Sequence, residues 1–475
     1  MTRAVLVALL LVACGSSRAP LPLPAAARSW VGPLPTPSDD RARLAAPEPP
    51  SIVSFTLPSG LSVQIAEQHA VPVVYAALVG RGSTSDASVE LDALIEIALG
   101  GDLTAEDLEP ATEEDTARVS ERGLVLTSRI VPAELDGVLV RYAGVLEGRA
   151  LTGERFAHAR AAVLGRARFT HDQRLRRGVT PEEDLFTRLY GEGHDRVRRM
   201  RMRPRVIERI DEARARRQLA SLLVPARSAL VIVGDVDAAT VGQAVRQRFS
   251  SLVRAELATS RERASPTFSD PATRLRIHGT RDEPSALVRL IERGPPIEHE
   301  DYAAFRLFAR LAGGMFSSGL NLRLRETRGD AYGVMTDVSD RVDHSILQIA
   351  VVVPVASASS AASAIVAELA RLSDASRIEA EELEIARSVE LAELAAALET
   401  STGLGRALAA AFLAGQPPSS IADTFARVAE LDAEAVATVG RRWIRPDKAP
   451  MIIVGDSLWL FTHPVRVPGG VDFAD

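Results

Sequence analysis

The chain has 475 residues, of which 46% are hydrophobic and 25% are charged. This length accommodates roughly two to four domains with large buried cores, and the composition is ordinary for a globular protein. The formal net charge of -6 gives no general reason to expect nucleic acid or an anionic membrane surface as a partner.

The N-terminus predicts export from the cytoplasm. Arg3 is followed by the apolar run of residues 4–12, which is too short to span a bilayer and has the length of a secretory-signal core. The run ends in Leu-Val-Ala before Cys14, which resembles a bacterial lipobox; an ordinary signal peptide that contains a cysteine is the alternative. Cys14 is the only cysteine, so it has no intramolecular disulfide partner. We therefore expect residues 1–14 to be a lipoprotein signal peptide and Cys14 to carry lipid.

The next segment is expected to be a tether. Residues 20–50 contain nine prolines and little apolar periodicity, so we assign residues 15–51 to an extended spacer. Gly15 follows the cysteine in place of the Asp that is associated with retention in the inner membrane. We therefore expect a lipid-anchored protein of the bacterial cell envelope, held at the outer membrane and facing the periplasm.

Folded sequence is expected to begin near Ser51. Apolar alternation and short apolar runs predict strands, and apolar residues spaced at i, i+3 and i+4 predict helices. The predicted strands lie at residues 57–65, 71–79, 123–131, 345–353 and 449–454, and the predicted helices include residues 91–99, 135–146 and 365–372.

The first predicted helix contains a carboxylate where an apolar side chain is expected. Glu96 lies among the helix's core-facing positions, which are Leu91, Leu94, Ile95, Ala98 and Leu99. Burial of an unpaired carboxylate costs several kcal/mol or forces its protonation. Glu96 is therefore expected to be paired or to take part in chemistry.

The order of these segments resembles the insulinase/pitrilysin-like zinc metallopeptidases. In that family an L-P-N-G-L-x-V strand and a Gly-Ser pair precede a helix with H-x-x-E-H, whose histidines bind zinc and whose glutamate is the general base. Here Leu-Pro-Ser-Gly-Leu-Ser-Val begins at Leu57 and Gly-Ser begins at Gly82. In the same frame the base position is Glu96, and Ala93 and Ile97 replace the two histidines.

The resemblance also implies that the third zinc ligand is missing. The family's ligand is a glutamate on the next long helix, and the segment that begins at Phe156 places Arg166, or Gly165 one residue earlier, at that position. Neither side chain binds zinc, and a guanidinium would repel it. Glu96 then has two interpretations: a relic carboxylate paired with Arg166 across the old site, which we favour, or a solvated side chain at its edge.

Three other patterns predict no site. The eight histidines contain no pair at i, i+4 spacing. Residues 195–217 hold ten arginines, but acidic residues interleave and no aromatic platform accompanies them, so a charged helix face is predicted instead of a nucleic-acid interface. Residues 102–115 hold seven carboxylates without the spacing of a calcium loop.

An internal repeat predicts two homologous halves. A turn, a buried strand and Gly-Asp recur near the ends of residues 52–251 and 273–475, and residues 252–272 have the composition of a linker. Chance recurrence of a common strand pattern is the alternative. The matched positions, each 221 residues apart, are Pro225 and Pro446, Gly234 and Gly455, and Asp235 and Asp456.

The second half keeps a motif that the family uses. The segment from Gly313 to Val334 resembles the family's G-G-G-M-S-S-R-L-F-x-x-L-R-E-x-R-G-L-A-Y-x-V, with Gly319 in place of an arginine. In the family the motif's arginine contacts the substrate backbone and its tyrosine stabilises the tetrahedral intermediate. The resemblance assigns these roles to Arg325 and Tyr332; a solvated arginine and a strand aromatic are the alternative.

The resemblance covers nearly all of the folded chain and implies an α+β fold. We expect two homologous halves of antiparallel sheet covered by helices, the LuxS/MPP-like metallohydrolase fold, which together form a clamshell. The expected function is the non-zinc subunit of a heterodimeric periplasmic metallopeptidase that supplies Arg325 and Tyr332 in trans to a zinc-bearing homologous subunit and a peptide substrate. A catalytically dead peptide-binding or assembly scaffold is the alternative. We expect no cofactor in this chain, zinc in the partner, and no nucleic acid.

Overall fold

The computed structural model describes residues 51–81, 88–100, 115–120, 122–253, 274–326, 331, 333–341, 343–465 and 471–473. The predicted signal peptide with Cys14, the tether up to residue 50, Gly82 and Tyr332 lie outside the described residues. So do most of the acidic segment 102–115 and nearly all of the predicted linker, and the boundaries of that linker stay predictions.

The first sheet has six strands in the order β1-β2-β6-β3-β5-β4. Strand β2 runs parallel to β6, and the other neighbours are antiparallel. The predicted strand at 57–65 starts too early, because Leu57 to Gly60 form the turn between β1 and β2, in which the Gly60 N–H donates to the Leu57 carbonyl at 2.8 Å. The strands are β1 (Ile52–Thr56), β2 (Ser62–Glu67), β3 (Val74–Gly80), β4 (Asp115–Ser120), β5 (Gly123–Ile130) and β6 (Ser228–Gly234).

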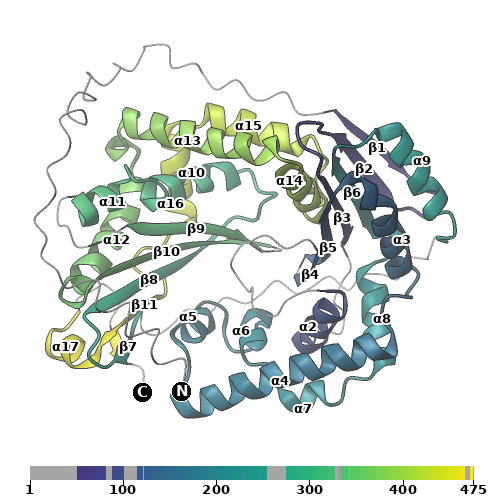
Figure 1. Ribbon diagram of the computed structural model, residues 1–475. Coiled ribbons are helices and arrows are strands. Elements are labelled where there is room, and N and C mark those ends of the chain that lie inside the picture. Colours follow the sequence, from purple (N-terminus) through teal and green to yellow (C-terminus); the bar gives the residue numbers. More distant parts are fainter. Residues whose placement is uncertain are drawn as a thin grey trace, which may run out of the picture. The chain divides into compact units, whose positions relative to one another are not determined.

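The second sheet also has six strands, in the order β12-β7-β11-β8-β10-β9. From the second position onward the two orders are equivalent, and both β2–β6 and β7–β11 are parallel pairs. Strands β6 and β11, which carry the repeated Gly-Asp, therefore occupy the same place in the two sheets (Figure 1). The strands are β7 (Leu275–Thr280), β8 (Ser285–Gly294), β9 (Val334–Asp340), β10 (Ser345–Pro354), β11 (Met451–Asp456) and β12 (Val471–Phe473).

One face of each sheet is covered by helices of the same half. Leu78 and Ile232 of the first sheet belong to one core with the first half's helices, and Leu290 and Ile349 of the second sheet belong to another. The first-half helices are α2 (Val89–Ala98), α3 (Leu135–Leu146), α4 (Gly153–Arg177), α6 (Asp195–Met200), α7 (Pro204–Ile207), α8 (Glu212–Leu222) and α9 (Ala238–Arg248). The second-half helices are α10 (Tyr302–Gly313), α11 (Gly319–Asn321), α12 (Ala358–Leu372), α13 (Ala380–Glu399), α15 (Ser420–Glu430), α16 (Ala433–Trp443) and α17 (Ser457–Thr462).

One helix from each half packs on the opposite sheet. Helix α5 (Pro181–Tyr190) of the first half buries its apolar side chains against the second sheet, and α14 (Ser401–Leu413) of the second half lies on β3 and β6 (Figure 1). Gly405 permits close approach of α14, because a Cβ there would lie 2.0 Å from the Tyr75 ring. This reciprocal exchange joins the halves.

The α+β fold of two helix-covered sheets is confirmed, with mixed instead of purely antiparallel sheets. Helix α3 has the predicted bounds. Helix α12, extended by the preceding turn, is long and apolar enough to cross a membrane, but 44% of that stretch is buried and it packs on β8 and β10. It is therefore accounted for as a core helix of the second half.

Candidate functional site

The structure brings together three of the four positions of the degenerate zinc frame. Ala93 and Glu96 on α2 and Arg166 on α4 line one cavity, and α2 packs on α4. Ile97 lies against the hydrophobic core of the first half instead. The arrangement that the resemblance implies is therefore present at three of its four positions, with none of its zinc ligands.

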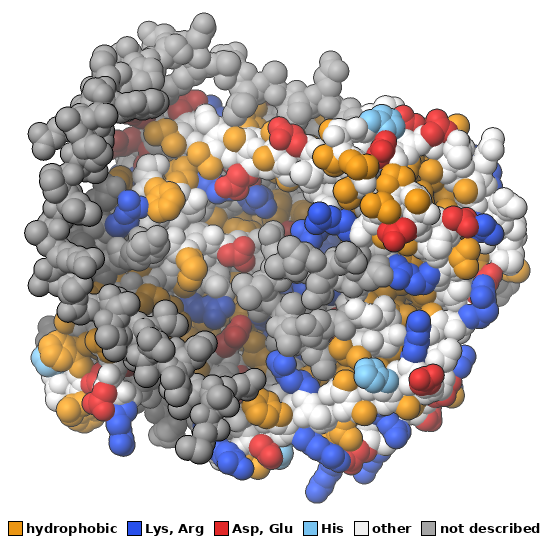
Figure 2. Space-filling model, viewed as in Figure 1, with side chains coloured by type: hydrophobic (Ala, Val, Ile, Leu, Met, Phe, Trp, Pro, Cys, Tyr) orange, Lys and Arg blue, Asp and Glu red, His pale blue; other side chains and the backbone are white. Residues whose placement is uncertain are grey.

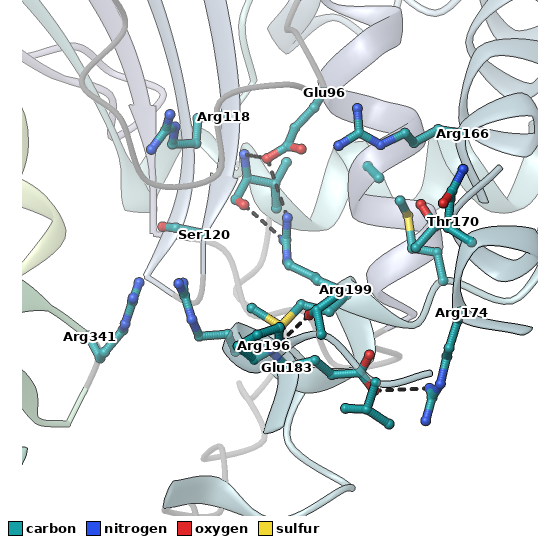
Figure 3. A pocket seen from close by; sticks show the side chains of 18 of the residues that line it. Glu96, Arg118, Ser120, Arg166, Thr170, Arg174, Glu183, Arg196, Arg199 and Arg341 are labelled. Carbon is teal, nitrogen blue, oxygen red and sulfur yellow. Dashed lines mark hydrogen bonds and ion pairs between the residues drawn. The ribbon is translucent and has the colours of Figure 1, made fainter. Parts of the chain in front are cut away.

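Glu96 is a buried carboxylate with a specific structural contact. The residue is 9% exposed, and its Oε1 accepts a hydrogen bond from the Val119 N–H at 2.6 Å. Arg199 lies 3.6 Å from the same oxygen and donates to the Val119 carbonyl at 2.9 Å (Figure 3). Val119 belongs to β4, the edge strand of the first sheet. Glu96 and Arg199 thus hydrogen-bond the N–H and C=O of an edge-strand residue, groups that an exposed edge offers to other chains.

The expected pairing of Glu96 with Arg166 is wrong. Arg166 points into the same space but makes no ion pair with any residue that the structure describes (Figure 3). The cation beside Glu96 comes from α6, which packs against α2. The order of helices along the chain did not show this contact, since α5 lies between α4 and α6.

The arginine-rich segment 195–217 is more than a solvated face. Arg199 also lies 3.6 Å from Asp92, and Arg203 donates from its backbone N–H and its Nε to Glu90, both at 3.2 Å. Both carboxylates are buried on α2. The segment therefore supplies the positive charge that permits α2 to bury its acidic side chains. The high number of arginines was a sign of this pairing, but the sequence alone did not identify the acidic partners.

The electrostatics of the acids on α2 differ with their contacts. Burial raises the pKa of Glu96, and the nearby Arg199 and the Val119 N–H offset this only in part. Burial opposes the ionisation of Glu90 as well, but hydrogen bonds from Ser88 and Arg203 outweigh it and lower the pKa of Glu90. Glu90 is therefore held firmly as a carboxylate, whereas the charge on Glu96 is costly.

The residues present do not fit zinc. Ala93 and Ile97 have no donor atoms, and Arg166 would place a cation at the third ligand position. Within the described ranges, no group of three His, Cys, Asp or Glu side chains has the geometry to hold a metal ion. Glu96 can take no step as a zinc-dependent base here, so no such step is assigned to it.

The cavity beside Glu96 is large and basic. Its volume is about 650 Å³, and it is bounded by α2, α4, α6 and β4 of the first half and by the end of β9 of the second. Blue side chains also gather around the hollowed centre of the face in Figure 2. Three described lining residues are acidic, namely Glu96, Glu183 and Asp340, and eight are arginines, namely Arg118, Arg122, Arg166, Arg174, Arg177, Arg196, Arg199 and Arg341.

The two halves meet at this cavity. Arg122, after β4, forms an ion pair with Glu298 of the second half at 2.5 Å and donates to the Arg341 carbonyl. Glu183 on α5 pairs with Arg174 at 3.0 Å and with Arg201. These contacts fix the cavity walls.

The second predicted site lies in the other half. Arg325 is partly exposed on a π-helical turn, Leu322–Glu326, and its guanidinium carbon lies 5.0 Å from the centre of the Phe316 ring. Asn321 fixes this segment by donating to the Met315 carbonyl at 2.7 Å and accepting from the Val334 N–H at 2.9 Å. Tyr332 is outside the described residues, so its role stays a prediction.

Gly319 departs from the family motif for a visible reason. A Cβ at this position would lie 2.1 Å from a carboxylate oxygen of Glu368, which is fully buried and paired with Arg371 at 2.7 Å. The space beside the motif is therefore filled by an ion pair of the protein itself.

Comparisons with known proteins agree with this architecture. Residues 209–389 match the family profile described as peptidase M16 inactive domain. No curated protein matches the chain.

Several solved structures have a similar fold. A protease from Helicobacter pylori has a TM-score of 0.68 at 16% identity, over 86% of this chain and 100% of its own. A peptidase M16 inactive domain from Pseudomonas fluorescens has a TM-score of 0.67 at 19% identity, over 86% and 98% of the two chains. The first half of the periplasmic protease PqqL from Escherichia coli has a TM-score of 0.66 at 16% identity, over 89% and 96%. Residues 209–389 are therefore similar to the peptidase M16 inactive domain, and the chain shares its fold with these peptidase structures.

Proposed function

We propose that the chain is the non-zinc subunit of a two-subunit insulinase-like peptidase and presents Arg325 and Tyr332 to a substrate held at the zinc of a homologous partner. The observation that carries this proposal is the contrast between the two sites. Glu96 is buried, hydrogen-bonded to the Val119 N–H and ion-paired with Arg199. Arg325 is partly exposed on a turn that the hydrogen bonds of Asn321 hold in place.

The proposed chemistry is electrostatic. The Arg325 guanidinium would hydrogen-bond the substrate backbone, and the Tyr332 phenol O–H would donate to the oxyanion that develops on the peptide carbonyl. Zinc, which the partner would hold, would activate the attacking water. In this chain Arg325 would bind and orient, and Tyr332 would stabilise the transition state.

The experiment is co-purification with a homologue that carries an intact H-x-x-E-H, followed by a peptide-cleavage assay. Tyr332→Phe is expected to lower kcat about ten- to a thousand-fold, the range for loss of one oxyanion donor. Arg325→Ala is expected to raise KM as well, because it removes contacts made before the transition state. Arg323→Ala is the matched control, since Arg323 lies two residues away and pairs weakly with Glu368 at 3.8 Å.

The second candidate is a peptide-binding or assembly scaffold, which the basic cavity beside Glu96 favours. Full activity in both Tyr332→Phe and Arg325→Ala complexes would support the scaffold. Peptidase activity of this chain alone would refute the proposal that it requires a zinc-bearing partner subunit.

The proposal includes a location in the bacterial envelope. The PqqL protease is described as periplasmic, and the lipobox-like sequence at Cys14 predicts a lipid anchor at the outer membrane. Mass spectrometry of the mature N-terminus is expected to find Cys14 as the first residue, modified by lipid. An unmodified cysteine or cleavage elsewhere would contradict the anchor.

A further inference from the structure

We propose that the arginine-lined cavity beside Glu96 is a binding site for the carboxylate side chains of an acidic peptide segment. The choice of a peptide rests on the proposed function, whereas the anionic character of the ligand rests on the cavity itself. The site lies where the family has its zinc ion, which polarises the peptide. In this chain guanidinium groups occupy that place instead, and they attract carboxylates.

The cavity has a surplus of positive charge among its described residues. Of the three acidic side chains in its wall, Glu183 already pairs with Arg174 and Arg201. Burial raises the pKa of Glu96, which works against its ionised form. The wall thus holds eight arginines and three acids, and three of these arginines, Arg122, Arg196 and Arg199, also pair with Glu298, Glu182 and Asp92 outside the wall.

Two of these arginines are available to a ligand. Arg166 and Arg177 on α4 are exposed and make no ion pair with any other described part of the chain, yet both line the cavity. Eleven residues of helix separate their Cα atoms by about 16 Å. An extended peptide of about five residues covers this length, so two or more acidic side chains of one segment can reach both guanidinium groups.

The remaining lining favours carboxylates over a nucleotide. The arginine fork matches the two oxygens of a carboxylate, and Thr170, Gln173 and Ser120 add neutral hydrogen-bonding groups. No Phe, Tyr or Trp is among the described lining residues, so a nucleobase would find no stacking surface there. A volume of about 650 Å³ lies within the usual range for ligand pockets and accommodates several side chains.

The test is fluorescence anisotropy on the purified full chain without a partner. The probe is a fluorescein-labelled hexaglutamate, and labelled hexaglutamine is the neutral control. Hexaglutamate is expected to bind at least about tenfold more tightly than hexaglutamine and to weaken as sodium chloride is raised. Equal affinity for the two peptides, or no binding of either, would overturn the proposal.

Matched variants locate the binding. Arg166→Gln with Arg177→Gln is expected to weaken hexaglutamate binding about tenfold or more. Arg176→Gln with Arg209→Gln removes the same charge from exposed positions that do not line the cavity, and is expected to change affinity less than about twofold. Equal losses in the two variants would show diffuse attraction and would refute the site.

Inorganic tripolyphosphate tests whether the site binds phosphate groups instead of peptide carboxylates. It is expected to compete only weakly with hexaglutamate. A different result would contradict the peptide ligand: tripolyphosphate binds tightly, the combined Arg166→Gln and Arg177→Gln variant abolishes that binding, and hexaglutamate does not bind. The ligand would then be a phosphate compound. Because these measurements need no catalysis, failure of the peptidase complex with intact hexaglutamate binding would refute only the proposed function.

Discussion

Helices α2 and α10 occupy equivalent places in the two halves, after β3 and β8, and they carry charges of opposite sign, which are buried on α2 and partly buried on α10. Helix α2 carries Glu90, Asp92 and Glu96, whose cations come from α6 and the residue before α7. Helix α10 carries arginines, whose carboxylate comes from α13. Duplicated folds can thus keep one packing arrangement with inverted charge, provided that a distant segment supplies the counter-charge.

The charged clusters of the two halves differ in how directly their side chains hydrogen-bond. In the second half Arg306 and Arg310 hydrogen-bond the buried Glu390 directly, at 2.6 and 2.7 Å. In the first half Arg199 lies 3.6 Å from both Asp92 and Glu96 and divides its donors among them and Val119. We therefore expect the second-half cluster to contribute more to stability and the first-half cluster to be more tolerant of change.

The largest expected effect is at Glu390. Glu390→Gln leaves two partly buried guanidinium groups without a carboxylate and is expected to destabilise the fold by about 3–5 kcal/mol. Burial opposes ionisation of Glu390, but Arg306 and Arg310 outweigh it and lower its pKa below the ordinary 4.5. Its contribution is therefore present above pH 4.5 and is lost as the pH falls below that value.

Thermal unfolding followed by circular dichroism at pH 7 and pH 4 measures this effect. Glu393→Gln is the control, because that side chain contacts Arg310 but is 56% exposed, and it is expected to cost less than about 1 kcal/mol. Equal melting temperatures for the two variants would contradict the comparison.

A smaller effect is expected from Glu292 on β8. Burial raises the pKa of Glu292 to about 8, since Arg445 and Arg274 offset it only in part. A folded pKa above the unfolded 4.5 means that the folded state binds this proton more tightly, so its contribution is present below pH 4.5 and is lost as the pH rises toward 8. We expect the wild type to lose about 2–4 kcal/mol between pH 5 and pH 9 relative to Glu292→Gln. Parallel stability profiles of the two proteins would exclude a buried acid of this kind.

The smallest effects are expected in the first-half cluster. Glu96→Gln keeps an oxygen for the Val119 N–H and removes a costly charge, so stability is expected to change by less than about 1 kcal/mol. Arg199→Met is expected to cost about 2 kcal/mol, and the double variant less than the sum, because it leaves no carboxylate at position 96. A double-mutant cycle from urea unfolding checks this; strict additivity would mean that the two side chains do not interact.

The sequence predicted what depends on local periodicity and on the repeat. The bounds of α3, the places of β6 and β11, and the position of Glu96 on a buried helix all follow from nearby residues. The exchange of α5 and α14 and the pairing of Glu96 with Arg199 depend on segments that are distant along the chain, and apolar spacing carries no information about such partners. The basic cavity was missed for the same reason, because its arginines come from several elements in both halves.

The most direct test of the account is the zinc content of the purified full chain, measured by plasma mass spectrometry after dialysis against zinc and then against buffer. We expect far less than one zinc per chain, because Ala93 and Ile97 have no donor atoms and Arg166 is a cation. The variant that combines Ala93→His with Arg166→Glu is the positive control and is expected to bind zinc, since it places two new ligands beside Glu96 in the wall of the same cavity. One tightly held zinc ion per wild-type chain would contradict the claim that this chain has exchanged its metal site for an ion-paired, arginine-lined one.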